Sequence, residues 1–225
     1  QDSFVNEIYR NLTGRNFDTD ILQTPSFKLI GGDIGGIQDF IYSVTSKHAL
    51  KGLRGRSFYL QMLSEAIALF ILKEFKLPET HIVYSGGGNF YLIVPETVVG
   101  LTDVKRKIEK SLLESHNGNL SFALSSISVS VMDIMEKSFG ELLITLKSNI
   151  HREKKKKFSH SIMEDRDTIL GPFDEGGQRS VCEICSSEFT EKEESERNQG
   201  NIQHCFLCDS FSKLARELAH KKVLA

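Results

Sequence analysis

The stretch LIGGDIGGIQDF, Leu29 to Phe40, places four glycines around a single aspartate, Asp33, at the end of an apolar run. The residues leading into it, SFKLI, are typical of a buried strand, and GIQDFIYSVTS after it carries apolar side chains at helical spacing. Bare backbone amides at the start of a helix can receive a phosphate group. On spacing alone, tight turns explain the same glycines equally well.

Beyond this stretch the pattern predicts a strand, helices, two strands, a helix and a last strand. The elements after the first strand are a turn at LKGLRGRS (50–57), an apolar helix (57–75), a hairpin of two strands (81–85 and 89–95) around Gly86 to Gly88, a helix (102–118) capped by Thr102 and stopped by Asn117-Gly118, a strand ISVSVMDI (127–134), and a helix from Phe139. This βαββαβ order predicts an α+β, ferredoxin-like fold.

In a ferredoxin-like sheet the first strand and the central hairpin are neighbours, so the Asp33 end of the strand should lie beside Gly86 to Asn89. A triphosphate suits two such glycine clusters. The nucleotide-binding candidates are Asp33, Ile34, Gly35, Gly36, Ser85, Gly86, Gly87 and Gly88. Asp33 could hold a divalent cation, although a helix-capping carboxylate is the simpler interpretation.

Three motifs, GGDIGGIQDFIYS, LRGRSFYLQML and YSGGGNFYLIVP, together resemble the first palm domain of the large, polymerase-like subunit of type III CRISPR effector complexes. The likeness is greater to the Csm branch (type III-A) than to the Cmr branch. It implies a palm of nucleotide cyclase and polymerase type, followed by a zinc-binding domain. Intact members add an HD-type nuclease domain for single-stranded DNA and a second palm. Their paired palms make cyclic oligoadenylate from ATP, with Mg²⁺ as cofactor, in antiviral defence.

The hairpin differs from that of active palms, which carry acidic residues where this chain has GGGNF. Gly88 and Asn89 cannot bind Mg²⁺ as anions, so we expect no catalytic residue in this chain. An adjacent His-Asp pair is also missing from the sequence. We therefore interpret the chain, which begins at Gln1 and not at methionine, as an excised middle piece of an active parent enzyme.

Two Cys-x-x-Cys pairs near the C-terminus predict a structural zinc site. Cys182, Cys185, Cys205 and Cys208 have the spacing of a Cys₄ site, whose closed tetrahedral coordination leaves no position for substrate. A disulfide or redox dithiol is the alternative, and His204 could replace one ligand.

Basic residues cluster in two places. Lys51, Arg54 and Arg56 could contact phosphates of ATP or of guide RNA, although a solvated turn explains them as well. The run REKKKKF, 152–158, is more typical of a helix end or a linker than of an RNA-binding arm.

The composition of the chain and the breaks in its sequence pattern predict its organisation. The chain has 225 residues, 40% of them hydrophobic, a formal charge of −2 and no apolar run near the ~20 residues of a membrane span. We expect a cytoplasmic protein without membrane contact. The expected divisions are an unassigned segment (1–25), the palm (26–145), a helix and linker (146–175) and the zinc domain (176–225).

The resulting hypothesis is a nucleotide-binding, noncatalytic half of a cyclic oligoadenylate synthase. Its expected partners are the second palm of the parent, other Csm-type subunits, and the guide RNA ribonucleoprotein with its target RNA. Two rivals stay open. One is a scaffold or RNA-contacting module without a nucleotide site, and the other is a stand-alone nucleotidyl cyclase.

Overall fold

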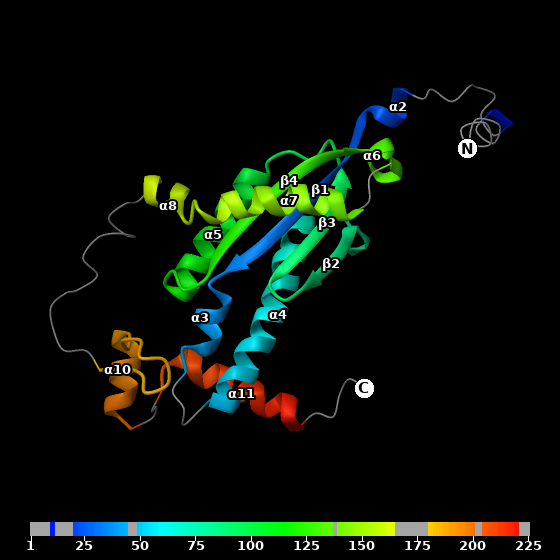
Figure 1. Cartoon of the computed structure of the whole chain (residues 1–225). Helices are drawn as coiled ribbons and strands as arrows, with labels where there is room; N and C mark the ends of the chain where they lie inside the picture. The colour runs from blue at the N-terminus through cyan, green and yellow to red at the C-terminus, as the bar shows by residue number, and fades with distance from the viewer. Residues whose placement is uncertain are drawn as a thin grey trace.

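The computed structural model describes residues 10–11, 20–44, 49–136, 139–164, 180–200 and 204–220. Figure 1 shows a sheet flanked by helices, with helices α10 (Glu191–Asn198) and α11 (Phe206–His220) beyond one end of it. None of the described helices combines the length and the apolar character that crossing a bilayer requires.

The sheet has four antiparallel strands in the order β2-β3-β1-β4. Their bounds are β1 (Pro25–Gly35), β2 (Ile82–Gly86), β3 (Asn89–Pro95) and β4 (Ser121–Ser130). The predicted α+β class, the element order and the hairpin are confirmed. Positive φ angles at Gly87 (61°) and Gly88 (85°) form the tight hairpin turn.

The last strand is the element whose bounds the pattern missed most. It starts six residues earlier than predicted, and α6 (Val131–Glu136) replaces its end. Ser130 and Asp133 explain the stop, because the Ser130 amide donates to the Asp133 carboxylate at 2.9 Å and the Asp133 amide donates to the Ser130 hydroxyl at 3.0 Å. This reciprocal pairing is a helix-start arrangement that strand alternation does not reveal.

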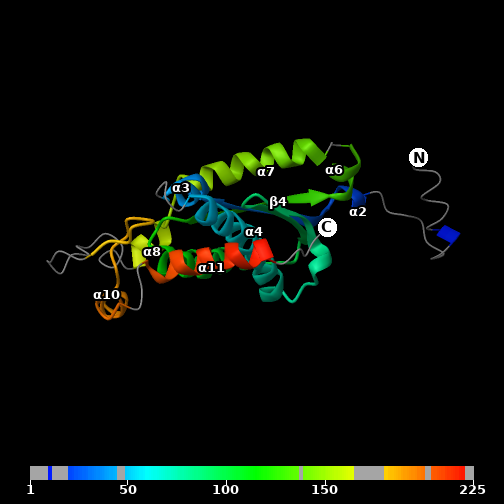
Figure 2. The ribbon, with the colours of Figure 1, turned by 90° about the horizontal axis from the view of Figure 1, so that it is seen from below.

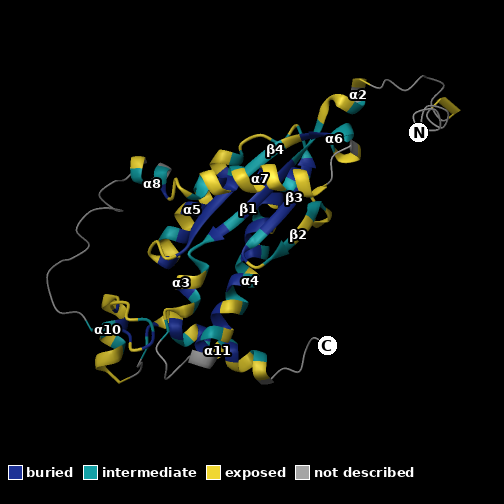
Figure 3. Ribbon diagram, in the orientation of Figure 1, coloured by how far each residue is buried: buried dark blue, intermediate teal, exposed yellow. Residues whose placement is uncertain are grey.

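One face of the sheet carries the larger core under α4 (Ala49–Glu74) and α5 (Leu101–His116). The predicted apolar helix therefore exists but begins earlier, since the residues expected to form a turn, 50–57, are its first two turns. Figure 3 shows buried residues along the sheet and along the face of α4 that covers it, with exposed residues on the outer face of the helix. The predicted Thr102 cap of α5 is wrong, because Gly100 occupies the N-cap, while Asn117 (φ 48°) ends the helix as expected.

The opposite face carries α7 (Phe139–Lys154) alone among the longer helices, as the view in Figure 2 shows. Leu142, Leu146 and Ile150 pack against β1 and β4, so the expected boundary at residue 145 falls inside a helix that covers the sheet. Because α7 lies over β1 and β4, the side chains of β2 on this face stay open. Tyr84 is 50% exposed and Val83 is 45% exposed.

Helix α11 packs against the N-terminal half of α4, where the sequence suggested a turn. Gly55 explains both the misreading and the contact, since a Cβ there would lie 2.2 Å from the carbonyl oxygen of Phe211. The glycine thus permits two helix backbones to approach closely and does not interrupt the helix. Phe211 joins the larger core, so the cysteine-bearing segment is packed onto the sheet domain. The remaining short helices are α2 (Asp20–Gln23), α3 (Ile37–Tyr42), η2 (Glu79–His81) and α8 (Ser159–Glu164).

Candidate functional site

The Asp33 end of β1 lies beside the hairpin, as the topology predicted. Asp33 pairs with Asn89 across the strands, and the Ile34 amide donates to the Gly88 carbonyl at 2.8 Å. Asp33 is not a helix cap, because Gly36 occupies the N-cap of α3. Its carboxylate forms an ion pair with the Lys154 ammonium of α7 at 2.6 Å, and its side chain is 17% exposed.

Close packing accounts for most of the glycines in the opening stretch. A Cβ on Gly32 would lie 2.1 Å from the Phe90 ring, and one on Gly36 would lie 2.2 Å from the Asn119 carbonyl oxygen. Gly88 would meet Ile37 of α3 at 2.0 Å. Gly87 differs, because no atom of the described residues lies within 4 Å of the position that its Cβ would take. The hairpin tip is therefore the open part of this backbone.

The candidate residues divide between the two faces of the sheet. Asp33 faces α7, whereas Ile34 is 2% exposed and belongs to the core under α4. Ser85 pairs with Phe90, which also belongs to that core, so its side chain lies on the same side. The Ser85 hydroxyl oxygen is buried, and no hydrogen-bond partner for it lies among the described residues. A ligand at Asp33 would thus meet the hairpin through Asn89 and backbone, not through the Ser85 side chain.

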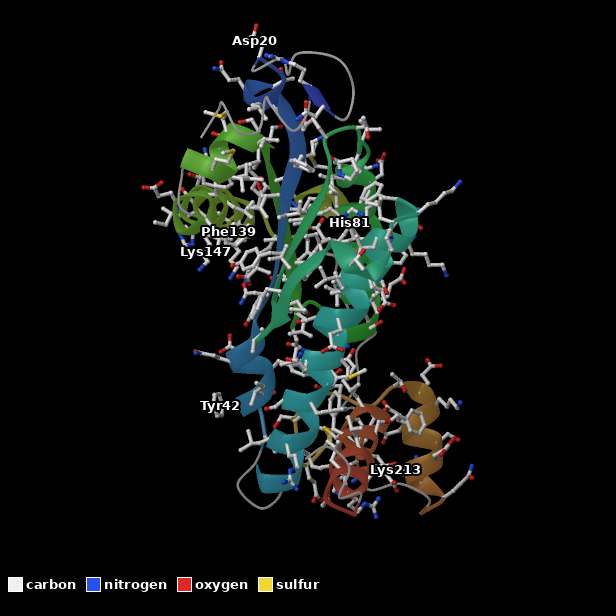
Figure 4. The ribbon with its side chains drawn as sticks, turned by 90° about the vertical axis from the view of Figure 1, so that its right-hand side faces the viewer. Asp20, Tyr42, His81, Phe139, Lys147 and Lys213 are labelled. Carbon is white, nitrogen blue, oxygen red and sulfur yellow. The ribbon has the colours of Figure 1, made fainter. Side chains whose placement is uncertain are left out.

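A groove runs along the open half of the α7 face. Its larger part, about 510 Å³, lies between α7 and the hairpin, and its smaller part, about 230 Å³, reaches Asp33. Asn89, Tyr91 and Lys147 line both parts. The larger part is further lined by Val83, Tyr84, Phe139 and Leu143, and the smaller part by Asp33, Ile150, His151 and Lys154. Figure 4 shows Phe139 and Lys147 on the side of the sheet that α7 covers.

The groove combines an apolar, aromatic end with a basic end. The Tyr84 and Tyr91 rings lie 5.9 Å apart at one end. Lys147 and Lys154 supply cations beside the Asp33 carboxylate at the other. Lys147 and His151 were not predicted as site residues, and Lys154 was considered only as part of the run 152–158. A signal existed in their i, i+4 and i+7 spacing, which puts them on adjoining positions of one helix.

The four cysteines converge into one cluster, as their spacing predicted. Their sulfur atoms all lie within 4.8 Å of one another, and those of Cys185 and Cys205 are 3.7 Å apart. Four sulfurs bound tetrahedrally at about 2.3 Å from a zinc ion would be roughly 3.8 Å apart, so the cluster fits such an ion. In the described part of the chain it is the one group of three or more Cys, His, Asp and Glu side chains placed to share a metal.

Backbone and thiol interactions support this interpretation. The Cys205 amide donates to the Cys182 sulfur at 3.4 Å, and the Cys208 amide donates to the Cys205 sulfur at 3.5 Å. Hydrogen bonding with Cys182 raises the pKa of both Cys205 and Cys208, because neighbouring thiols without a cation cannot all ionise together. A dication would remove that obstacle. Among the described residues, none of the four cysteines forms a disulfide.

The basic residues in the first two turns of α4 have different environments. Arg54 is exposed, whereas Arg56 is 3% exposed and donates to groups inside the protein, which leaves it unsuited to a phosphate contact. The side chain of Lys51 lies outside the described residues. In the run 152–158, Lys154 pairs with Asp33 and Lys156 pairs with Glu153, so part of this charge is neutralised within the chain.

Comparisons with known proteins agree with the resemblance. Residues 26–174 match the family model described as Csm1 subunit domain B. A protein of Methanocaldococcus jannaschii named CRISPR system single-strand-specific deoxyribonuclease Cas10/Csm1 (subtype III-A) is 28% identical over 95% of this chain and 27% of its own length. The protein of the same name from Thermococcus onnurineus is 30% identical over 85% of this chain and 25% of its own length. The chain thus spans about a quarter of these relatives.

Solved structures extend the likeness to three dimensions. A Csm1-Csm4 cassette in complex with one ATP is 30% identical with a TM-score of 0.57, over 68% of this chain and 22% of that one. A Csm1-Csm4 cassette in complex with cA4 is 26% identical with a TM-score of 0.58, over 75% of this chain and 26% of that one. The chain therefore belongs to the Csm1 family of type III-A CRISPR systems, and residues 26–174 correspond to its domain B.

Proposed function

We propose that this chain is the first palm and the zinc-binding part of a Cas10/Csm1 subunit, and that it holds nucleotide for cyclic oligoadenylate synthesis without catalysing it. The strand order β2-β3-β1-β4 and the βαββαβ element order agree with a ferredoxin-like palm. Solved Csm1-Csm4 relatives include complexes with ATP, pppApA, cA3 and cA4. The parent's synthase and nuclease activities belong to the same proposal.

One observation carries the nucleotide site. The groove at the Asp33 end of β1 places aromatic rings at one end and three basic side chains, Lys147, His151 and Lys154, at the other. A base can stack on an exposed tyrosine, and phosphates are attracted to clustered lysines. The open backbone at Gly87 lies two residues before Asn89, which lines this groove. Asp33 would then orient Lys154 and take Mg²⁺ only when a nucleotide brings the cation.

The noncatalytic role follows from the hairpin. Asn89 occupies the position opposite Asp33, where a second carboxylate would be needed for a two-metal centre. Among the described residues that line the groove, Asp33 is the one carboxylate, and it is already paired. Chemistry would therefore require the second palm of the parent, and that requirement disfavours the stand-alone cyclase.

The cysteine cluster would hold Zn²⁺ in a structural role. Cys182, Cys185, Cys205 and Cys208 would supply four thiolates and leave no open coordination position. Bound zinc would fix the segment that carries α11 against α4. Other Csm subunits, with Csm4 first because the solved relatives are Csm1-Csm4 complexes, and the guide and target RNA are the proposed partners.

Calorimetric titration of ATP with Mg²⁺ tests the nucleotide site. We expect saturable binding that Lys147→Met weakens about 10-fold or more, the effect of losing one charged contact. Lys110→Met is the matched control, because Lys110 is equally cationic and exposed but lies on α5, over the other face of the sheet. Gly87→Val should weaken binding as well, since it obstructs the open hairpin tip.

The same titration distinguishes the nucleotide site from the rival interpretation, a scaffold or RNA-contacting module. Packing explains Gly32, Gly36 and Gly88 without any ligand, which is the observation that favours a scaffold or RNA-contacting module. Such a module would release no heat with ATP, in this chain or in the intact subunit, and would bind guide RNA with a steep salt dependence. If Lys147→Met binds ATP as tightly as the unsubstituted chain does, the nucleotide must bind elsewhere.

A further inference from the structure

Arg56 joins the cysteine cluster to the helix that follows the Asp33 end of β1. Its Nη1 atom donates to the carbonyl oxygen of Phe40 and to the Ser43 hydroxyl at 2.6 Å, both at the C-terminal end of α3. Its Nη2 atom donates to the Cys208 sulfur at 3.5 Å. The Phe40 and Phe211 rings lie against the guanidinium, at 5.2 and 5.6 Å from its central carbon.

The charge of Arg56 requires a nearby anion. The side chain is 3% exposed, and a buried guanidinium without a counter-charge is strongly destabilising. Among the described residues, its hydrogen-bond acceptors are carbonyl and hydroxyl oxygens of Phe40 and Ser43 and the Cys208 sulfur. Only the sulfur can carry negative charge. Four thiolates around a dication have a net charge of −2, so a loaded cluster supplies the anion that Arg56 needs.

A short series of hydrogen bonds also connects the cysteine cluster to the start of α3. The Cys208 sulfur contacts Arg56, Arg56 holds the Phe40 carbonyl, and the Phe40 amide donates to the Gly36 carbonyl at 2.9 Å. Gly36 follows β1 directly and is the N-cap of α3. A helix of six residues has little stability of its own, so a cation at its C-terminal carbonyls contributes substantially to its order.

We propose that Arg56 is a positioning residue that ties the metal-loaded cysteine cluster to α3, so that metal binding orders the segment following the Asp33 end of β1. The inference rests on the metal site of the proposed function and not on nucleotide binding. The aromatic contacts with Phe40 and Phe211 hold the guanidinium in the plane that lets it donate in both directions.

Cobalt titration and hydrogen exchange test the two halves of this proposal. Cobalt(II) bound by four thiolates gives strong sulfur-to-metal absorption, which reports affinity directly. We expect Arg56→Met to bind Co²⁺ about 10- to 100-fold more weakly than the parent chain, the usual effect of removing a partner of a metal ligand. Arg54→Met, an exposed arginine of the same helix, is the matched control and should leave the affinity unchanged.

Hydrogen exchange of the amides from Phe40 to Val44 measures whether metal binding orders α3. In the unsubstituted chain, Zn²⁺ should slow the exchange of these amides at least 10-fold relative to the chain from which a chelator has removed the metal. In Arg56→Met the same amides should exchange quickly with or without metal. If Arg56→Met fails to fold, two measurements still test the proposal. One is exchange in the unsubstituted chain with and without Zn²⁺, and the other is the charge-conserving variant Arg56→Lys. Arg56→Lys should keep most of the metal affinity and lose the slowed exchange of α3, because lysine lacks the fork that reaches both sides.

Two results would overturn the proposal. One is a Co²⁺ affinity of both Arg56 variants within twofold of that of the unsubstituted chain. The other is an exchange rate of the α3 amides that Zn²⁺ does not change in the unsubstituted chain. Either result with stoichiometric metal bound would refute only the role of Arg56. A chain that binds neither Co²⁺ nor Zn²⁺ stoichiometrically would refute the metal site and the role of Arg56 together.

Discussion

The glycine at position 32 offers a direct test of whether the opening glycine stretch is shaped by packing. A Cβ at this position would lie 2.1, 2.4 and 2.8 Å from three atoms of the Phe90 ring, which belongs to the facing residue of β3. To reach an ordinary contact of 3.4 Å, the ring would have to retreat by roughly 1.3 Å. Phe90 is 0% exposed and stacks against Phe122 at 6.1 Å, so little room exists for that movement.

Gly32→Ala should therefore lower the free energy of unfolding by about 3 kcal/mol, the upper end of the usual range for overpacking. Phe90→Leu alone should cost about 1–2 kcal/mol through lost ring contacts, less than the 3–5 kcal/mol typical of truncating a buried Phe to Ala. In the double variant the leucine leaves space for the new methyl group. The two costs should consequently fall short of additivity by about 1–2 kcal/mol, within the range observed for residues in contact.

Urea unfolding followed by far-UV circular dichroism measures these differences, with Gly87→Ala as the control at an open glycine. In the part of the chain that the structure describes, no atom lies within 4 Å of the Gly87 Cβ position, so the cost of Gly87→Ala should be confined to the backbone, about 1–2 kcal/mol for a left-handed residue. Additive effects of Gly32→Ala and Phe90→Leu would refute the packing argument. The glycine would then have to be explained by a ligand that approaches the strand.

Three further outcomes follow from the buried polar groups and the cysteine cluster. Burial lowers the pKa of His116, so the unfolded chain binds its proton more readily, and the free energy of unfolding should fall by up to about 1.4 kcal/mol per pH unit below about pH 6.5. His116→Gln should flatten this slope in urea titrations between pH 7.5 and 5.5, and equal slopes would contradict it. Lys105→Met should cost about 3–5 kcal/mol in the same assay at pH 7, because Lys105 pairs with the buried Glu109 at 3.8 Å and with Glu153 at 2.7 Å; a loss below 1 kcal/mol would show that the network contributes little. Cys205→Ser should leave residues 180–220 open to limited proteolysis and lower the bound zinc below one equivalent while the sheet domain persists, and full protease resistance would argue against structural zinc.

The fold illustrates how far local patterns reach. Alternating and helical periodicities are local properties, and they predicted the four strands, the hairpin and the helices that became α4, α5 and α7. The end of the last strand was missed because of the local capping pair Ser130 and Asp133, whereas the error at 50–57 has a tertiary cause. The glycines of 50–57 suggested a turn, but Gly55 lies inside α4 because α11 packs on it. No periodicity encodes which distant helix will use a glycine.

The candidate site divides in the same way. The spacing of Cys182, Cys185, Cys205 and Cys208 by itself determined a four-thiol cluster, because two residues between cysteines place their sulfurs on one side of a tight turn. The order of elements likewise determined that Asp33 meets the hairpin, since chain topology limits which strands can be neighbours. Only the tertiary structure decided that Lys154 neutralises Asp33, that Ser85 faces the opposite core and that Arg56 turns inward to Cys208. Those assignments depend on which face α7 and α11 cover, and that choice is made by summed packing over the whole molecule.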